Sequence, residues 1–373
     1  MLESVEWGEY RLGDLFEILS SKKRFDANKI IIGDQGHPYV VRTSQNNGIR
    51  GLIKEEERFL NDDNTISFGQ DTATMYYQPI PYFTGDKIKI LKPKIHQFNK
   101  GNAQFFISCL QKPFISFTWG ASSFNVKTIE KQTILLPTSK GEIDFEFMEK
   151  FIAELKALRI AELKAYLFVT GLKDYTLTPE EEQAIKDFEA GNIKWGEFDV
   201  IKVFEVRNAG NILANEIVEG SGSIPYLCAS RENNAVSSYI SYREELITEG
   251  NCIFIGGKTF VVTYQECDFF SNDSHNLTLR LYDSEHRTKL KQLYLTTCVT
   301  KSLGHKYSWG DSVSNRKIQK DKILLPCIHG QVDFSKMGTF ISAIQKLVIK
   351  DVVLYVDREI EATKQVVSRT SKI

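Results

Sequence analysis

The amino-acid sequence predicts a mixed α/β (α+β) protein made of two copies of one domain, each followed by a long helix. The first observation is an internal repeat of about 190 residues, a period that fits a whole domain and far exceeds a solenoid unit. The second is a set of short β-branched or aromatic segments bounded by Gly, Asn, Asp or Pro, which is typical of strands. The third is a pair of long apolar stripes with helical spacing.

The repeat is carried by five anchors that keep their order along the chain, with offsets of 187 to 190 residues. The paired segments are 6–18 and 194–206, 42–48 and 229–235, Gly69 and Gly256, 117–137 and 307–326, and 141–158 and 330–347. Because order and spacing are both kept, the chain is predicted to be an internal duplication with a pseudo-twofold relation between its halves.

The repeat divides the chain into four predicted parts. Residues 1–140 and 194–330 form the two α/β domains. Residues 141–193 hold the first long helix and a linker helix, and residues 331–373 hold the second long helix. Within the domains, the patterning predicts strands at residues 65–69, 87–92, 259–264 and 276–282, and core helices at residues 103–112 and 287–303.

Each long helix carries apolar residues at alternating steps of three and four, which is the pattern of a coiled-coil seam. The first stripe starts at Phe145 and meets no Gly or Pro before Gly171, and the second starts at Phe334. Each helix could pack only on its own domain. Because the stripes are copies of one another, we favour an antiparallel coiled coil in which the two helices pack together and separate the domains.

A short helix is predicted in the linker to the second copy. Thr178 is its N-cap, Pro179 occupies the first helical position, and acidic residues fill the first turn. Gly191 marks its end. The simplest interpretation of the acidic residues is that they complement the helix dipole on a solvated face.

Composition and charge exclude several classes of protein. The formal net charge is -1, so any nucleic-acid contacts would come from local clusters and not from a basic domain. No apolar run approaches the roughly 18 residues of a membrane span, and the acidic N-terminus lacks the pattern of a signal peptide, so a cytoplasmic protein is expected. The six cysteines never form Cys-x-x-Cys and the histidines are isolated, so no metal site is expected.

The catalytic motifs that the sequence could carry are absent or broken. Residues 255–259 resemble the end of a phosphate-binding P-loop, but Cys252 stands where glycine is required and a strand-like segment follows instead of a helix. The sequence has neither the Asn/Asp-Pro-Pro-aromatic loop of an adenine amino-methyltransferase nor a glycine-rich turn for an adenosyl cofactor. The chain is therefore predicted to be non-catalytic and to hold no cofactor.

Two related domains on a helical spacer suit double-stranded DNA, because two half-sites one helical turn apart are separated by roughly 34 Å. A helix from Phe145 to Val169 would be about 37 Å long at 1.5 Å per residue, so the spacing is permissive.

The repeated loop, RTSQNNG at residues 42–48 and ASRENNA at residues 229–235, has the chemistry for reading bases. Asn and Gln can pair bidentately with adenine, and Arg with guanine. Each Asn pair could instead hold a β-turn through bonds from its side chains to the backbone, and both interpretations stay open. Since Gln45 stands opposite Glu232, the two half-sites are expected to differ.

Other differences point the same way, because Gln70 stands opposite Gly257 and residues 272–276 have no clear match near residues 84–86. Further candidates for DNA contact are glycine-containing loops that could admit a phosphate, turns after two Trp-Gly pairs, and basic clusters, each of which could equally be ordinary surface. The candidates in the first copy are Lys22, Lys23, Arg24, Thr43, Ser44, Gln45, Asn46, Asn47, Gln70, Thr72, Ser122, Ser123 and Lys127. Those in the second copy are Ser230, Arg231, Asn233, Asn234, Lys258, Thr259, Asn272, Ser274, His275, Lys306, Ser312, Arg316 and Lys317.

Three segments and their second copies carry a family resemblance: residues 7–18, residues 38–48, and residues 135–137 with the helix after them. On these segments the whole chain resembles the specificity (S) subunits of Type I restriction-modification systems, including those of BcgI-like systems. The resemblance implies that each domain is a target recognition domain that reads one half of a bipartite, asymmetric DNA target. It also implies that the helices form the spacer between the two domains.

The same resemblance implies partners. Two modification (methyltransferase) subunits would bring S-adenosylmethionine and methylate adenine, and a restriction subunit could join them. Base-contacting residues do not transfer, because the recognition domains are the most variable part of the family.

Two alternatives from other classes stay open. A hydrolase or nuclease with its active site in a repeated loop would be expected to keep an acid or metal cluster in one copy, and neither copy shows one in its sequence. A protein-binding scaffold or a mimic of the S subunit would be expected to be strongly acidic, whereas the chain is near neutral.

Overall fold

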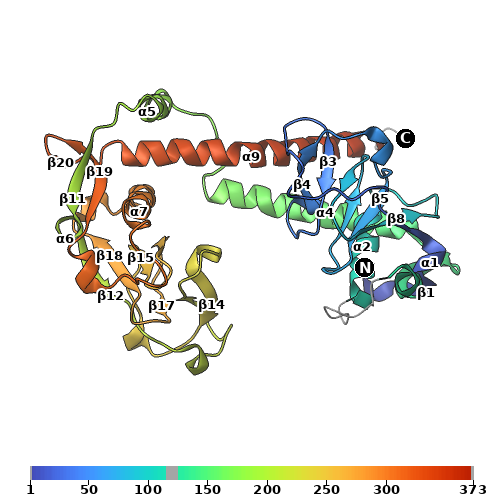
Figure 1. Cartoon of the computed structure of the whole chain (residues 1–373), viewed down its shortest axis with the longest axis horizontal. Coiled ribbons are helices and arrows are strands. Elements are labelled where there is room, and N and C mark those ends of the chain that lie inside the picture. Colours follow the sequence, from blue (N-terminus) through green and yellow to red (C-terminus); the bar gives the residue numbers. More distant parts are fainter. Residues whose placement is uncertain (1, 115–124, 371–373) are drawn as a thin grey trace. The chain divides into compact units, whose positions relative to one another are not determined.

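The computed structural model describes residues 2–114 and 125–370, with the side chains of residues 363–370 outside the description. The chain forms two compact units, Met1–Leu163 and Lys164–Ile373 (Figure 1). Each unit contains two three-stranded sheets and one four-stranded sheet together with helices, so the predicted mixed α/β class with two repeated domains is confirmed. In the part of the chain that the structure describes, no helix has the length and apolar character needed to cross a membrane.

The first unit is described by its three sheets and its helices. The sheets, in strand order, are β1-β9-β10 (Glu6–Arg11, Thr133–Ser139, Glu142–Ile143), β2-β8-β5-β6 (Phe16–Ser20, Ile88–Pro93, Thr65–Gly69, Met75–Gln78) and β4-β3-β7 (Ile49–Ile53, His37–Val40, Phe83–Thr84). The α-helices are α1 (Leu12–Leu15), α2 (Ala103–Phe114), α3 (Val126–Glu130) and α4 (Phe145–Val169), of which α4 runs past the end of the unit.

The second unit has sheets of the same orders. They are β11-β19-β20 (Trp195–Asp199, Lys322–Ile328, Gln331–Val332), β12-β18-β15-β16 (Phe204–Asn208, Leu277–Leu281, Cys252–Gly256, Val261–Gln265) and β14-β13-β17 (Val236–Ile240, Ile224–Leu227, Phe270–Ser271). Its α-helices are α5 (Pro179–Glu189), α6 (Val200–Val203), α7 (Lys289–Leu303), α8 (Asn315–Ile318) and α9 (Met337–Thr370). Because the strand orders match one for one, the duplication in the sequence is a duplication of the fold.

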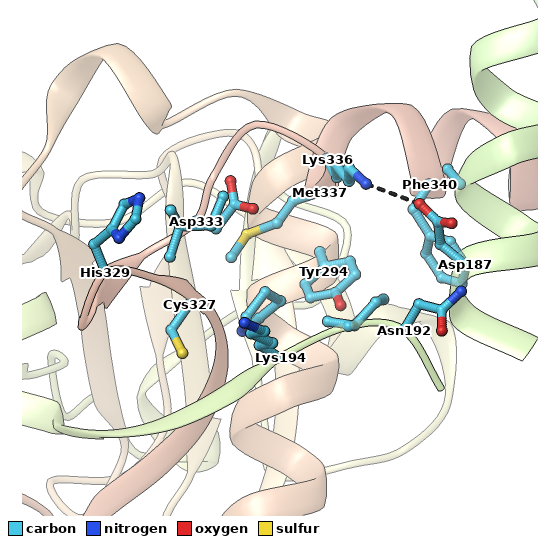
Figure 2. Close-up of a pocket in the computed structure, with 14 residues that line it drawn as sticks. Asp187, Asn192, Lys194, Tyr294, Cys327, His329, Asp333, Lys336, Met337 and Phe340 are labelled. Atoms are coloured by element: carbon cyan, nitrogen blue, oxygen red, sulfur yellow. Dashed lines mark hydrogen bonds and ion pairs between the residues drawn. The ribbon is translucent and has the colours of Figure 1, made fainter. Parts of the chain in front are cut away.

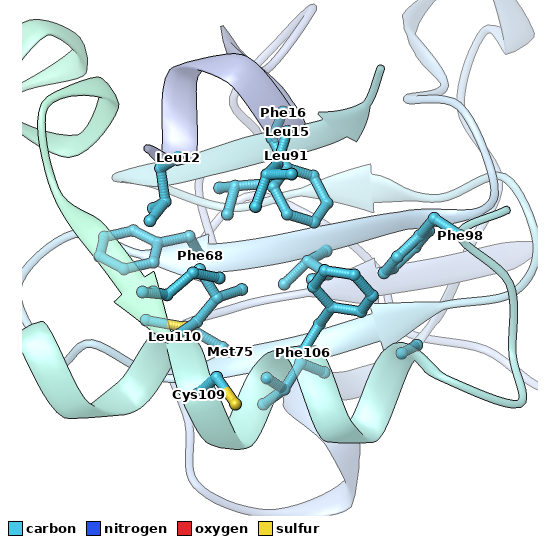
Figure 3. Packing of buried hydrophobic residues seen from close by; sticks show 14 of the residues in the cluster. Leu12, Leu15, Phe16, Phe68, Met75, Leu91, Phe98, Phe106, Cys109 and Leu110 are labelled. Atoms are coloured by element: carbon cyan, nitrogen blue, oxygen red, sulfur yellow. The ribbon is translucent and has the colours of Figure 1, made fainter. Parts of the chain in front are cut away.

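The main core of the first unit lies between α2 and the four-stranded sheet (Figure 3). Phe16 of β2 lies edge-on to Phe98 and Phe106 at centroid distances of 5.5 and 5.9 Å, a geometry that aromatic rings favour. Phe68 and Leu91 of the sheet are fully buried beside them. The helix predicted at residues 103–112 is therefore confirmed as α2, with its apolar face on the sheet.

A buried tyrosine anchors the sheet β4-β3-β7 of the first unit and its counterpart β14-β13-β17 in the second. The Tyr39 hydroxyl donates to the Phe25 carbonyl over 2.7 Å, and the Tyr226 hydroxyl donates to the Ile212 carbonyl over 2.6 Å. In both cases the tyrosine strand, β3 or β13, pairs antiparallel with one neighbour and parallel with the other. The repeated loop leaves this strand, so both copies of the loop start from equivalent backbone.

The strand pairing supplies the match that the sequence did not show for residues 272–276. Val40 pairs with Thr84 and Leu227 pairs with Ser271, so the offset there is 187. In the next strand Phe68 pairs with Lys89 and Ile255 with Leu277, an offset of 188. Asn272 and Asp273 therefore correspond to Gly85 and Asp86. The expectation that residues 272–276 have no match was wrong, because the second unit has one additional residue before β18 that hides the match in the sequence.

The two long helices start differently. Helix α4 covers Phe145–Val169 as predicted, because the Asp144 carboxylate accepts the Phe147 N–H over 2.8 Å and caps the first turn. Helix α9 begins at Met337, three residues after the predicted start, because Asp333 bonds the Ser335 N–H over 2.9 Å and holds a separate turn. Mutual packing of α4 and α9 stays a prediction.

The linker helix α5 has the predicted ends. Thr178 and Glu181 form a reciprocal capping box, and Gly191 lies beyond the last turn at φ +68°. The solvated face predicted for its acidic residues holds for Glu180 and Glu182, which are exposed, and was wrong for Glu181, because α5 packs along α9. Glu181 is buried and accepts bonds from Ser342 and Lys346 of α9 over 2.6 and 2.9 Å.

Candidate nucleic-acid interface

The repeated loop has one backbone conformation in both units. In the first unit the Val41 N–H donates to the Gly48 carbonyl over 2.8 Å, and in the second the Cys228 N–H donates to the Ala235 carbonyl over 2.9 Å. Both residues of each Asn pair have positive φ angles, between +46° and +51°. Asn tolerates this left-handed region better than most residues, which explains why the pair recurs.

The Asn side chains hold the turn. Asn46 Nδ2 donates to the Ile49 carbonyl over 3.1 Å, and Asn233 Nδ2 donates to the Val236 carbonyl over 3.0 Å. Asn234 Nδ2 reaches the Tyr264 carbonyl of β16, also over 3.0 Å. The turn interpretation is confirmed for Asn46 and Asn233, whereas Asn234 ties the loop to β16. Base reading by these side chains stays a prediction that would use their remaining acceptor groups.

The tip of the loop is where the copies differ. Gln45 in the first unit and Arg231 and Glu232 in the second are exposed. Among the described residues, no hydrogen bond or ion pair engages these three side chains. The neighbouring hydroxyls are used internally, because Thr43 and Ser230 each accept the N–H two residues ahead, over 3.2 and 3.1 Å. Ser44 lies exposed at the same tip.

The turns that follow β5 and β15 approach other backbone closely, as expected for glycine loops, but the partner belongs to the chain itself. The Gly257 N–H donates to Asn276 Oδ1 over 3.0 Å, and a Cβ at Gly257 would lie 2.3 Å from the His275 carbonyl oxygen. Thr259 donates to the Ala229 carbonyl over 2.9 Å. In the first unit Gln70 and Thr72 lie in the equivalent turn, where the Thr72 hydroxyl bonds that of Thr74 over 2.9 Å.

A small charged cluster lies beside that turn in the second unit. Asp273 Oδ2 lies 2.8 Å from Lys258 Nζ, and Asp273 Oδ1 lies 2.9 Å from the His275 N–H and 2.8 Å from His275 Nδ1. Burial opposes ionisation of Asp273, but Lys258 and His275 together lower its pKa to about 2. The carboxylate therefore fixes two of the predicted DNA-contacting groups at one place. Asn272 and Ser274 flank it, each accepting a hydrogen bond from an Asn side chain.

The basic cluster of the first unit is dispersed over four partners. Lys22 pairs with Asp62 over 3.1 Å, Arg24 pairs with Asp86 over 2.8 Å, and Lys23 lies over the Phe25 and Phe59 rings. All these ion pairs are exposed, so each is worth about 1 kcal/mol or less and leaves the cation available for a phosphate.

The basic residues near α8 are less alike than their sequence indicates. Lys306 pairs with the buried Asp321, and Lys317 pairs with Asp311 and also donates to the Ser312 carbonyl over 2.8 Å. Arg316 is exposed and has no ion pair among the described side chains. Lys127 of α3 is likewise exposed and unpaired within the described ranges. Ser122 and Ser123 lie outside the described residues.

The structure brings together residues that the sequence did not single out. Arg42, the first residue of the loop, and Arg50, two residues after its end, line one hollow with Arg24, Thr72 and Asp86. Their place at the two edges of RTSQNNG was the available signal, since Arg commonly contacts DNA phosphates.

A second pocket, of about 380 Å³, lies in the other unit where α5, α7, the β19–β20 hairpin and the start of α9 meet (Figure 2). Its most prominent polar contact is the Lys336–Asp187 ion pair of 2.8 Å, which ties α9 to α5. The pocket therefore lies where the linker helix packs against the rest of the second unit. Within residues 2–114 and 125–370, no group of three or more His, Cys, Asp or Glu side chains could hold a metal ion.

Two copies of one α/β domain, each presenting an equivalent polar loop with a different tip, define a two-domain recognition protein. The sequence profile of the family described as "Type I restriction modification DNA specificity domain" matches residues 4–165 and 192–354. Because the two matches cover most of the chain, the chain belongs to this family. The resemblance seen in the sequence is thereby confirmed.

Relatives and solved structures agree with this assignment. The chain is 22% identical over 356 residues to the "Type II restriction enzyme BgcI specificity subunit S.BcgI" of Heyndrickxia coagulans, covering 92% of this chain and 96% of that protein. It also resembles the crystal structure of a Type-I restriction-modification system S subunit from M. genitalium, with a TM-score of 0.57 and 13% identity. That likeness covers 97% of this chain and 94% of the other, and at this identity it shows the shared fold alone.

Proposed function

We propose that the chain is the DNA sequence-specificity subunit of a restriction-modification complex, in which each domain binds one half of a bipartite double-stranded target. The observation that carries the proposal is the repeated loop. Its turn is built by the same hydrogen bonds in both units, whereas its exposed tip carries Gln45 in one and Arg231 with Glu232 in the other. A kept scaffold with changed tips suits two readers of different sequences, so the target is asymmetric.

In this proposal, residues 1–140 and 194–330 form the two target recognition domains. Residues 141–193 and 331–373 form the helical parts between and after them. The helices set the distance between the half-sites and dock two modification subunits. Apolar side chains on both helices, such as Leu158 of α4 and Val348 of α9, support the spacer role, because they belong to the two stripes that are predicted to pack together.

The chain itself carries out no chemistry in this proposal. S-adenosylmethionine and the adenine-methylating site belong to the modification subunits, and a restriction subunit is an optional further partner. A cytoplasmic location follows from a DNA target. The near-neutral charge of -1 speaks against an acidic mimic of DNA or of an S subunit.

The proposal is tested by co-expression. The purified chain alone is expected to give no methylated adenine in DNA, and co-expression with its modification subunit is expected to give methylation at one bipartite motif. The modification subunit alone serves as the control. Methylation by the chain without a partner would refute the assignment as a specificity subunit. Methylation of the same motif by the modification subunit alone would refute it as well.

A further inference from the structure

Three arginines from separate segments line one hollow of about 740 Å³ in the first unit. Arg24 follows β2, Arg42 opens the repeated loop, and Arg50 lies in β4. The same hollow is lined by Thr72 and by two carboxylates, Asp26 and Asp86. The three guanidinium groups stay charged at any physiological pH and outnumber the two carboxylates, so the lining has a net positive charge that favours an anion.

The arginines are held to different degrees. Arg42 is partly buried and bonded to Asp71, whose carboxylate also accepts Lys87 Nζ over 2.8 Å. Arg24 makes an exposed pair with Asp86. Arg50 is exposed and forms no ion pair with any side chain that the structure describes. Arg50 lines the hollow together with the buried Tyr39, and its charge acts against the rise in the pKa of Tyr39 that burial causes.

The second unit keeps the scaffold of this hollow and lacks its arginines. Equivalent positions are fixed by pairing, because Tyr39 pairs with Gly51 as Tyr226 pairs with Ser238, an offset of 187. The same offset matches three shared groups, Tyr39 with Tyr226, Thr72 with Thr259, and Asp86 with Asp273. It matches the three arginines with Asn211, Ala229 and Ser237. Because the second unit folds without them, the arginines are not needed to build the domain.

From this difference, and resting on the proposed function, we propose that Arg24, Arg42 and Arg50 form a clamp for a DNA backbone phosphate in the first unit, where the second unit holds Lys258 and His275 on Asp273 instead. A phosphate protrudes from the duplex and fits a hollow, whereas base edges lie within a groove and are reached by protruding side chains. Arg50 is the principal contact, because it has no internal partner to give up. Arg42, oriented by Asp71, and Arg24 complete the positive wall.

The clamp contributes a phosphate contact in the half-site of the first unit to the salt dependence of binding. Each phosphate contact releases counterions, so log K for DNA falls with log salt by about 0.9 per contact. Loss of one contact therefore weakens binding by about fivefold at 0.15 M salt, equally for every target sequence. A base contact would instead change the preferred sequence.

The test uses the complex of the full chain with its modification subunit and measures DNA affinity against salt concentration. The variants are those that the second unit already tolerates: Arg50→Ser alone, and Arg24→Asn with Arg42→Ala and Arg50→Ser together. Ser237→Ala, at the position that matches Arg50 in the second unit, is the control. We expect Arg50→Ser to weaken binding about fivefold and reduce the salt slope by about 1, the combined variant to lose more, and the control to change neither.

A second measurement pairs Arg50→Ser with DNA in which single phosphates are replaced by neutral methylphosphonates. One position in the half-site of the first unit is expected to weaken wild-type binding and to have no further effect on the variant, which identifies the clamped phosphate. Inorganic phosphate, exchanged for chloride at constant ionic strength, is expected to leave DNA affinity unchanged.

Three outcomes overturn the clamp: an unchanged salt slope, an altered target motif in Arg50→Ser, or competition by inorganic phosphate that the combined variant abolishes. An altered motif would make Arg50 a base contact, and phosphate competition would make the hollow a site for the free anion. Failure of the proposed function is distinct, because the wild-type complex would then bind all sequences alike.

Discussion

Replacing Glu181 with Gln tests how the linker helix α5 is held on α9. Glu181 is 5% exposed and its carboxylate accepts bonds from Ser342 Oγ, Lys346 Nζ and the Thr178 N–H over 2.6, 2.9 and 2.8 Å. Gln keeps the size and one acceptor oxygen but removes the charge. Lys346 and Thr178 bond the same oxygen, Oε2, so a Gln oxygen placed there keeps both bonds and loses the charge assistance of the bond to Lys346. A hydrogen bond to a charged group contributes about 1.5–3 kcal/mol.

The cost should lie near the lower end of that range. Lys346 keeps the Thr176 carbonyl at 2.9 Å and Asp174 at 3.7 Å as partners, so its ammonium is not left unpaired. We expect Glu181→Gln to lower the free energy that holds α5 in place by about 2 kcal/mol, below the 3–5 kcal/mol of a broken, fully buried pair. Faster amide hydrogen exchange confined to α5 would report it.

The same carboxylate predicts a pH dependence. Burial opposes its ionisation, but the bonds from Ser342, Thr178 and Lys346 leave the pKa of Glu181 lowered. A lowered folded-state pKa means that the contribution is present above the unfolded value of about 4.3 and is lost as the pH falls through the folded value. Docking of α5 should weaken over that acidic range in the wild type, and Glu181→Gln should lack this loss.

Glu182→Gln is the matched control in the same helix. Its pair with Lys186 is 3.7 Å long and more than half exposed on both sides, so it is worth about 0.5 kcal/mol or less. If Glu181→Gln gave the exchange rates of Glu182→Gln, the argument that buried bonds hold α5 on α9 would be refuted.

Three further substitutions test the loops. Gly257→Ala should destabilise the second unit by about 2 kcal/mol, because the new Cβ would meet the His275 backbone, and an unchanged denaturation midpoint would contradict this. Asn46→Ala should lower the free energy of unfolding by about 1–2 kcal/mol, since Ala loses the bond to Ile49 and is strained at φ +46°. The target motif should stay unchanged, and a changed motif would show that Asn46 reads a base. Glu232→Gln should alter base preference in one half of the target only, as read by methylome sequencing.

Local chemistry made much of the fold predictable. The N-cap Thr178 and the stop at Gly191 act within α5 itself, so the sequence placed that helix correctly. The repeat added information that a single segment lacks. The apolar spacing of α4 was enough to predict that helix. Its copy α9 begins later than predicted, because Asp333 bonds the nearby Ser335 N–H, whereas the equivalent Asp144 caps the first turn of α4.

What escaped prediction depends on contacts between distant segments. Glu181 looked solvated because its partners Ser342 and Lys346 lie more than 160 residues away. The arginine-lined hollow escaped for the same reason, since Arg24, Arg42 and Arg50 meet only when β3 pairs with β4 and β7.

For the repeated loop, the sequence identified the right place and left its chemistry open. Asn46 and Asn233 hold the turn, so the differences at Gln45 and Glu232 are the better guide to what each unit reads.

The central claim is that one chain reads two different half-sites independently, and methylome sequencing of an exchange variant tests it most directly. Residues 1–140 are replaced by the corresponding part of a relative, and the variant and the wild type are each co-expressed with the modification subunit. We expect a bipartite, asymmetric motif in which the exchange changes one half and leaves the other half unaltered. A continuous motif, or a change in both halves, would contradict the account.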